Sequence, residues 1–271
     1  MSLPAPASDR TCLVTGASSG IGAEIARVLA SRGHGVTLAA RRAERLQALA
    51  EELSGRHRIR AEAVTLDLTD PSARAGLRAE IEGRGLTVDV VVNNAGLSTL
   101  GRVSAADRDA ELTMVRTNVE AVVDLCTSFL PGMVERRRGA ILNVASTAAF
   151  QPLPGQAGYG ATKAFVLSYS QALAAELAGS GVTVTALCPG PVKTGFGQAA
   201  GFTEEQEDSA LPSFMWVPAA KVAAEAVEGM DQGRTVVIPG RANAVLASFG
   251  RHAPRRLVLP IVARSHPGLK N

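Results

Sequence analysis

Cysteine is scarce in this chain of 271 residues, which contains only Cys12, Cys126 and Cys188. The three lie far apart within apolar runs, and an odd number without metal-ligand spacing argues against a disulfide framework or a zinc site. We therefore expect buried, reduced thiols and no bound metal. Reduced thiols in turn indicate a cytoplasmic protein, or one at the inner face of the membrane.

Long apolar runs and aromatic residues are also few. No run approaches the length of a transmembrane helix, and the first ten residues lack the apolar core of a signal peptide, so we expect residues 1–9 to be a disordered lead. Aromatic residues make up 4% of the chain, whereas hydrophobic residues, many of them Ala, Val and Leu, make up 46%. This composition suits one α/β domain whose parallel sheet is covered by helices on both faces.

Acidic residues are absent after Asp231. Residues 232–271 hold seven of the 28 Lys and Arg and no Asp or Glu, so the remainder has 21 basic against 25 acidic residues, a net charge of −4. In residues 241–271 these cations alternate with Leu, Val, Ile and Phe, a composition compatible with peripheral contact with an anionic membrane surface. A cover for a substrate site and a subunit contact are the alternatives, and nucleic acid is not expected. Prolines at 254, 260 and 267 are expected to prevent one continuous helix.

Two residues in the middle of the chain have the spacing of an acid-base pair. Tyr159 and Lys163 are four apart in a run without proline, so on a helix they share one face. An ammonium at about 4 Å contributes on the order of 4 kcal/mol toward phenolate, close to what acid-base chemistry near neutral pH requires of a tyrosine. Burial opposes this effect, so a second positive charge, such as that of an oxidised nicotinamide ring, would help.

The beginning of the chain has the order of elements of a dinucleotide site. Residues 11–15 indicate a buried strand, which is followed by Gly16, Gly20 and Gly22, a helix and a second apolar run at 36–40. Glycines at such a turn let the backbone approach a pyrophosphate at the helix N-terminus. The pattern alone is a weak signal, because a purely structural turn also needs glycine.

The residues after the second apolar run indicate which dinucleotide is bound. An enzyme that uses NAD usually presents an acid there to the ribose 2′-hydroxyl, whereas this chain has Arg41 and Arg42 and no acid from 33 to 43. Two cations at the start of a helix oppose its dipole unless an anion is present. We therefore predict NADP(H) in preference to NAD(H), with two solvated arginines as the alternative.

Several motifs occur together along the chain: TGASSGIG at 15–22, NNAG at 93–96, Asn118, Ser146, Tyr159-x-x-x-Lys163 and Pro189-Gly190. Together they resemble the classical branch of the short-chain dehydrogenase/reductase family, over about residues 9 to 240 and in the family's order. The resemblance implies a single Rossmann-type domain at 10–240, built as a doubly wound parallel sheet with helices on both faces. A basic, apolar C-terminal extension then occupies 241–271.

The resemblance also implies a catalytic tetrad of Asn118, Ser146, Tyr159 and Lys163. Ser146 would donate to a substrate carbonyl, and Tyr159 would protonate its oxygen as hydride arrives from nicotinamide. The backbone of Asn118 would hold a water that returns protons to Lys163. The residues around Asn118 also predict a long helix, because apolar side chains recur at steps of three and four: Leu112, Val115, Val119, Val122, Cys126, Phe129 and Met133. An asparagine within this pattern indicates either a solvent-facing position or a kink, and we expect the kink.

The cofactor contacts follow from the same resemblance. Asp67 would bond to the adenine, with a turn carboxylate as the alternative, and Thr194 would contact the nicotinamide amide. For Asn93 and Asn94, bracing of the backbone is as well supported as cofactor contact. The full set expected to bind the cofactor is Gly16, Ser18, Ser19, Gly20, Ile21, Gly22, Arg41, Arg42, Asp67, Leu68, Asn94, Ala95, Gly96, Tyr159, Lys163, Pro189, Gly190, Val192 and Thr194.

These observations predict an NADP(H)-dependent alcohol dehydrogenase or carbonyl reductase. The segment after residue 194 is rich in large apolar side chains, which suggests an apolar substrate unless they only anchor the loop: Phe196, Phe202, Leu211, Phe214, Met215 and Trp216. The alternative is a regulatory or scaffold protein that binds the dinucleotide without turnover, although such relatives usually lack the tyrosine or the lysine. The helix from Tyr159 to Ala178 is apolar nearly all round, which predicts a homodimer or homotetramer.

Overall fold

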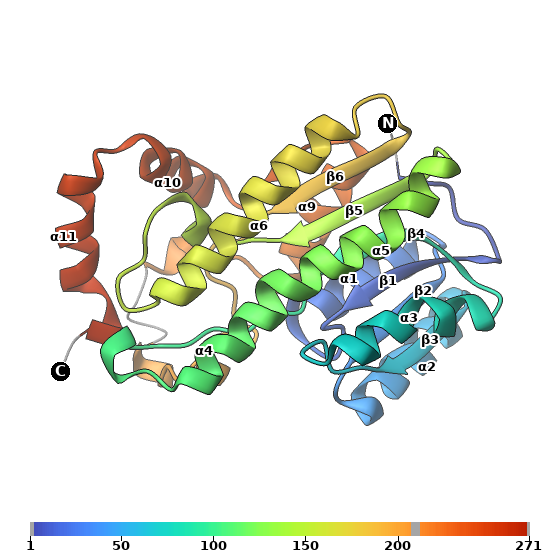
Figure 1. The fold of residues 1–271 in the computed structure, drawn as a ribbon, viewed down its shortest axis with the longest axis horizontal. Helices are drawn as coiled ribbons and strands as arrows, with labels where there is room; N and C mark the ends of the chain where they lie inside the picture. Colours follow the sequence, from blue (N-terminus) through green and yellow to red (C-terminus); the bar gives the residue numbers. More distant parts are fainter. Residues whose placement is uncertain (1–2, 207–211, 270–271) are drawn as a thin grey trace.

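The computed structural model describes residues 3–206 and 212–269 and places seven strands in one parallel sheet (Figure 1). Their order is β3-β2-β1-β4-β5-β6-β7, and each neighbouring pair is parallel. The strands are β1 (Arg10–Thr15), β2 (Val36–Ala40), β3 (Ala61–Thr65), β4 (Thr87–Asn93), β5 (Gly139–Val144), β6 (Val182–Leu187) and β7 (Val236–Val237). The central strands are almost continuously apolar because both of their faces are buried. The predicted doubly wound parallel sheet is confirmed.

Helices cover both faces of this sheet and create two apolar cores. One core lies under α1 (Gly20–Ser31), α2 (Ala43–His57) and α9 (Ala219–Asp231). The other lies under α3 (Pro71–Gly83), α5 (Ala121–Glu135) and α6 (Ala157–Glu176). The order of strands reverses between β1 and β4, and ligands of such sheets bind at the carboxyl ends of the strands at this point.

Short helical segments lie in the connections that follow the strands. They are η1 (Val103–Ala105), α4 (Arg108–Val115), η2 (Arg116–Glu120), η3 (Thr147–Phe150), α7 (Phe196–Ala199) and η4 (Ser213–Met215). The chain ends with α10 (Arg241–His252), α11 (Arg255–Ser265) and η5 (Pro267–Leu269). Figure 1 shows α10 and α11 in red, beyond the carboxyl ends of the strands.

The long apolar helix expected around Asn118 is interrupted by a π-helical turn, η2, between α4 and α5. The wider turn shifts the register of the helix, so Met114 is buried while Val115, which the apolar pattern placed on the inner face, is 41% exposed. The pattern was therefore wrong at Val115. The expected irregularity at Asn118 is confirmed, because Asn118 lies within this turn.

The two ends of the chain agree only in part with the structure predicted for them. Pro254 separates α10 from α11 as predicted, but Pro260 lies inside α11, which tolerates the loss of one hydrogen bond in its second turn. In the lead, residues 3–9 form no helix or strand, yet Leu3 is buried and its N–H donates to Asp231 Oδ1 at 3.0 Å. Within the described ranges, no helix is long and apolar enough to cross a membrane.

Candidate active site

The turn between β1 and α1 has a backbone that only glycine accommodates easily. Gly16 and Gly20 have positive φ angles of 65° and 59°. At Gly22 a Cβ would lie 2.3 Å from Nδ2 of Asn94, closer than two such atoms approach. The turn is therefore pressed against the NNAG segment that follows β4, and both lie where the strand order reverses.

Asn94 braces this turn through its side chain. Its Nδ2 donates to the carbonyl of Thr15 at 2.9 Å, while the N–H groups of Asn94 and Ala95 donate to Thr15 Oγ1 at 3.0 and 3.2 Å. Asn93 is buried, and its Nδ2 donates to Asn143 Oδ1 at 2.8 Å. Bracing of the backbone and contact with the cofactor were the two roles considered for Asn93 and Asn94, and the structure supports bracing by their side chains. The contribution of Thr15 could not be read from the sequence.

The N-terminus of α1 has the features of an anion site. Ser19 precedes the helix without capping it, and the first turn contains no acid, so its N–H groups face the turn without a side-chain partner. From the end of β2, Arg42 donates through Nη2 to the hydroxyls of Ser18 at 2.8 Å and Ser19 at 2.7 Å. A cavity of about 470 Å³ adjoins this position, and its lining includes Ser18, Ser19, Gly20, Arg45, Lys193 and Thr194. Its lining also includes the carboxylates of Glu24 and Glu52, which are both paired with Arg27.

The electrostatics at Arg42 favour a bound anion. Its pKa is lowered by partial burial and then by the neighbouring positive charges of Arg45 and Arg41. An anion between these groups would relieve their repulsion. The open helix N-terminus, the two hydroxyls and the cations together fit the phosphate groups of NADP(H).

On the other side of the cofactor position, Asp67 has the geometry of a turn carboxylate. Its Oδ1 accepts hydrogen bonds from the N–H of Thr69 at 2.9 Å and from Thr69 Oγ1 at 2.8 Å, which lower its pKa. The adjoining Leu68 is held by its backbone carbonyl, which accepts from Arg74 Nη1 at 2.6 Å. The loop that was predicted to hold adenine is thus fixed by its own turn and by Arg74.

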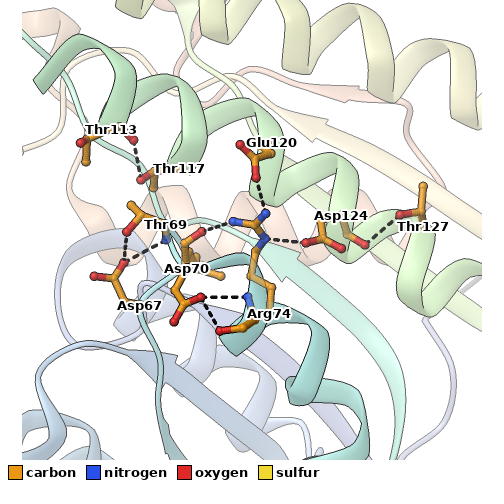
Figure 2. A network of polar contacts seen from close by, with 11 residues as sticks. Asp67, Thr69, Asp70, Arg74, Thr113, Thr117, Glu120, Asp124 and Thr127 are labelled. Atoms are coloured by element: carbon orange, nitrogen blue, oxygen red, sulfur yellow. Dashed lines mark hydrogen bonds and ion pairs between the residues drawn. The ribbon is translucent and has the colours of Figure 1, made fainter. Parts of the chain in front are cut away.

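Arg74 connects this loop to the π-helical turn, as Figure 2 shows. Its side chain is only 3% exposed and forms ion pairs with Glu120, the last residue of η2, and with Asp124 of α5. Because every nitrogen of the guanidinium has an acceptor, removal of Arg74 would leave the loop and the helix without a direct polar link at this point. No motif in the sequence identified this residue.

Asn118 is completely buried in η2, which excludes the solvent-facing alternative. Its Oδ1 accepts from the N–H of Leu97 at 2.8 Å, and its Nδ2 donates to the carbonyl of Leu97 at 2.9 Å and to Thr162 Oγ1 at 3.0 Å. The side chain therefore joins the loop that follows NNAG to α6. Thr162 and Lys163 are adjacent in α6, so this contact also fixes the position of Lys163.

The structure brings Ser146, Tyr159 and Lys163 together. Ser146 follows β5, and its Oγ accepts from the N–H of Ala148 at 3.1 Å, so its hydroxyl proton is available to another acceptor. Tyr159 lies in the first turn of α6 and hydrogen-bonds with Ser146. One turn later, Lys163 Nζ lies 5.8 Å from the centroid of the Tyr159 ring and donates to the carbonyl of Val144 at 2.7 Å.

Burial dominates the acid-base properties of this pair. It raises the pKa of Tyr159, and the hydrogen bond with Ser146 acts in the opposite direction. It lowers the pKa of Lys163 to about 8. The expected depression of the Tyr159 pKa by Lys163 is not found in the protein alone, where the pKa follows from burial and the hydrogen bond with Ser146. At neutral pH Tyr159 holds its proton and Lys163 is charged, which suits proton donation to a carbonyl oxygen.

The loop after β6 closes the site from the far side. The carbonyl of Pro189 accepts from the N–H of Thr147 at 2.9 Å, next to Ser146, and a Cβ on Gly20 would lie 3.1 Å from the Thr194 side chain. At Gly190 a Cβ would lie 2.5 Å from the amide of Asn243, which donates to the carbonyls of Met215 and Pro239. Asn243 thus packs on this loop from α10, and no motif in the sequence identified it.

The apolar side chains after residue 194 divide into two groups. The ring of Phe196 lies 5.8 Å from that of Tyr159, and Phe202 packs edge-on against His266. By contrast, Phe214 is 69% exposed, and Trp216 lies under Lys193 Nζ. Leu211 lies outside the described residues. Phe196 is thus placed to contact a substrate at Tyr159, whereas Phe214 is directed to solvent.

Neither metal chemistry nor thiol chemistry competes with this site in the part of the chain that the structure describes. Those residues contain no cluster of three His, Cys, Asp or Glu that could hold a metal ion. Cys12, Cys126 and Cys188 are buried and form no disulfide, and burial raises the pKa of Cys126 to about 12.

Comparisons with known proteins agree with this geometry. The family described as short chain dehydrogenase matches residues 10–205. An NADP-dependent 3-hydroxy acid dehydrogenase of Salmonella typhi is 43% identical over 182 residues, which are 66% of this chain and 71% of that protein.

Solved structures match over nearly the whole chain. A short-chain dehydrogenase from Sphingobium yanoikuyae in complex with NADPH has a TM-score of 0.79 at 33% identity, covering 94% of this chain and 93% of that one. A bulky-bulky ketone specific alcohol dehydrogenase from Comamonas testosteroni has a TM-score of 0.74 at 28% identity, covering 97% and 93%.

Proposed function

This chain belongs to the short-chain dehydrogenase/reductase family of oxidoreductases, and we propose that it is an NADP(H)-dependent carbonyl reductase that also oxidises the corresponding secondary alcohol. The observation that carries the proposal is the convergence of Ser146, Tyr159 and Lys163 at the carboxyl ends of the strands. The reduced nicotinamide, when bound, supplies the hydride. The protein supplies the proton and holds the carbonyl oxygen.

Each of the three side chains has a distinct task in this proposal. The hydroxyl of Ser146, which also hydrogen-bonds with Tyr159, is placed to donate a hydrogen bond to the carbonyl oxygen and to orient it. Tyr159, protonated at neutral pH, transfers its proton to that oxygen as the alcohol forms. The charged Lys163, held by the carbonyl of Val144, stabilises the phenolate that remains. Asn118 anchors the adjoining segments, and we propose that its backbone supports the return of the proton.

The proposed preference for NADP(H) over NAD(H) rests on Arg42. Its guanidinium lies on the hydroxyls of Ser18 and Ser19 beside two further cations, Arg41 and Arg45, an arrangement that a ribose 2′-phosphate would complete. Cofactors in the names of related proteins agree, because both the Salmonella dehydrogenase and the Sphingobium structure are described with NADP(H).

We propose an uncharged, apolar ketone as the substrate. Phe196 packs against Tyr159, and the carboxylate of Glu111 lies close to the same end of α6, where a Cβ on Gly158 would be 2.3 Å from its Oε2. Thr99 Oγ1 donates to Glu111 at 2.5 Å and fixes its position. A carboxylate against Gly158, the residue before Tyr159 in α6, would oppose an anionic substrate at this end of the helix, which favours an uncharged ketone over a 3-oxo acid.

A matched pair of substrates tests this assignment. NADPH oxidation is measured with a medium-chain 3-oxo ester and with the corresponding 3-oxo acid, which differ mainly in charge. We expect a clearly higher kcat/KM for the ester and a smaller difference between the two in Glu111→Gln. A preference for the acid in the unaltered protein would overturn the substrate class while leaving the oxidoreductase in place.

We also propose that the protein forms a dimer or tetramer through α6. One side of this helix carries exposed small residues and Phe165, which is 40% exposed and stacks on Tyr169. An apolar helix face that the sheet does not cover is a common subunit contact. Analytical ultracentrifugation decides the point, and Phe165→Glu is expected to shift the protein toward the monomer.

A further inference from the structure

The C-terminal extension folds back over the loops that flank Ser146 and Tyr159. α10 packs against η3, which begins directly after Ser146, and a Cβ on Gly250 would lie 3.1 Å from Gln151 Oε1. Farther along, a Cβ on Gly268 in η5 would lie 3.0 Å from the N–H of Gly101 and 3.1 Å from the carbonyl of Gly155. The last turn of the chain therefore lies on the substrate side of the site.

His266 is the polar centre of this contact. It is buried, its Nδ1 accepts from the N–H of Gly268 at 3.2 Å, and its Nε2 lies 3.2 Å from Gln156 Oε1. Because Nδ1 is an acceptor, the proton of a neutral imidazole is on Nε2, which donates to Gln156. Gln156 Nε2 donates in turn to Ser98 Oγ at 2.7 Å. One chain of hydrogen bonds thus connects η5 to two loops.

Both loops lead to residues of the proposed reaction. Ser98 follows NNAG after β4, and Gln156 immediately precedes α6, in which Tyr159 lies. The N–H of Gly101 also donates to the carbonyl of Gly155 at 2.8 Å, so the two loops are already paired. The His266 ring touches a third segment through Phe202.

We propose that His266 is a specificity-determining residue that holds η5 as a wall of the substrate site. The inference rests on the proposed reductase activity. This wall limits the size of the ketone that reaches Tyr159, and it lies away from Arg42 and the glycine turn, so it acts on the substrate and not on NADP(H). The extension beyond residue 240 is thereby a cover for the substrate site, one of the alternatives that its composition left open.

The wall depends on a neutral imidazole. Burial lowers the pKa of His266, which keeps it neutral at physiological pH. A protonated ring would direct a donor from Nδ1 at the N–H of Gly268 and lose that bond. The partners that face the ring, in Gln156, Gly155, Gly268 and Phe202, carry no charge. Of the charged residues close to these segments along the chain, Arg102, Glu204 and Arg264 are exposed, and Lys270 lies outside the described residues.

The test compares His266→Ala, Gln156→Ala and the double variant, with His252→Ala as the matched control because His252 is exposed on α10. KM and kcat are measured for a series of ketones of increasing size, together with the NADPH Kd and Tm. We expect each single variant to change the KM for ketones by about tenfold and to shift the selectivity toward larger ketones. The NADPH Kd is expected to stay unchanged. The double variant is expected to resemble either single one, since both interrupt the same chain of hydrogen bonds. His266→Gln, which keeps a donor for Gln156, is expected to recover part of the selectivity.

Several outcomes separate this inference from the activity itself. Unchanged ketone selectivity in His266→Ala, or a parallel loss of NADPH affinity and Tm without a change of selectivity, overturns the role of His266 and leaves the reductase intact. If the unaltered protein reduces no ketone, the proposed function fails. In that case, amide hydrogen exchange of residues 98–101 and 151–156 tests whether His266 holds these two loops together. His266→Ala must accelerate the exchange of these residues, and His252→Ala must not.

Discussion

Replacing Arg42 by alanine should weaken the binding of NADPH much more than the binding of NADH. The guanidinium forms short hydrogen bonds to Ser18 and Ser19 at the open N-terminus of α1, so an incoming 2′-phosphate meets a cation that is already positioned. Hydrogen bonds to charged groups contribute about 1.5–3 kcal/mol, and the lower end applies here because Arg42 is exposed and screened by solvent. We therefore expect about a tenfold rise in the NADPH Kd.

The assay is a fluorescence titration of each variant with NADPH and NADH at two salt concentrations. The NADH Kd should change by less than about threefold, and the effect on NADPH should shrink at high salt, as for any partly exposed charge pair. Arg56→Ala is the matched control, since Arg56 is exposed at the opposite end of α2. Equal losses of affinity for the two cofactors in Arg42→Ala would refute the assignment of the 2′-phosphate to this position.

Three further perturbations follow from the geometry. The pKa of Lys163 is lowered to about 8, so its charge is present below that pH and lost above it. The kcat of ketone reduction should therefore be level below pH 8 and fall above it. Lys163→Met should abolish this fall of kcat at high pH, along with most of the activity. Gly22→Ala places a Cβ 2.3 Å from Asn94 Nδ2, so we expect the free energy of unfolding in urea to fall by about 1–3 kcal/mol and NADPH binding to weaken. Gly55→Ala in α2 is the control, because its Cβ meets nothing within 4 Å and the change should be neutral or slightly stabilising. Arg74→Met leaves the Leu68 carbonyl and the carboxylates of Glu120 and Asp124 unpaired. Because both carboxylates can rehydrate, we expect the free energy of unfolding to fall by only about 1–3 kcal/mol. An unchanged Tm would show that the network in Figure 2 contributes nothing to stability.

The regular part of the fold could be predicted from the sequence because its signals are local. Apolar runs of strand length, glycine turns and a capping aspartate at position 70, whose side chain accepts from the N–H of Ser72, specify their elements through neighbours in the chain. The pair of Tyr159 and Lys163 was accessible for a similar reason, since the two are one helical turn apart, whereas Ser146 and Asn118 joined the predicted tetrad only through the family resemblance.

The parts that the sequence could not supply are contacts between distant segments. Thr15, Arg74, Asn243 and His266 act through partners that the tertiary fold brings to them, and each is an unremarkable polar residue where it stands in the chain. The acidity of Tyr159 also required the structure, because its pKa is raised by burial, and burial depends on how much water the fold excludes. Contact of the C-terminal extension with a membrane and the cellular location stay predictions, and flotation with anionic vesicles tests the first.

The most direct test of the account is Tyr159→Phe, which removes one oxygen from the site and leaves the ring beside Phe196. Ketone reduction and NADPH binding are measured in parallel on the unaltered protein and the variant. A general acid contributes about 10²–10⁴-fold, so the account predicts a loss of kcat of that size, a much smaller change in the NADPH Kd and an unchanged Tm. Turnover retained in Tyr159→Phe would contradict the assignment of Tyr159 as the proton donor on which the proposed function rests.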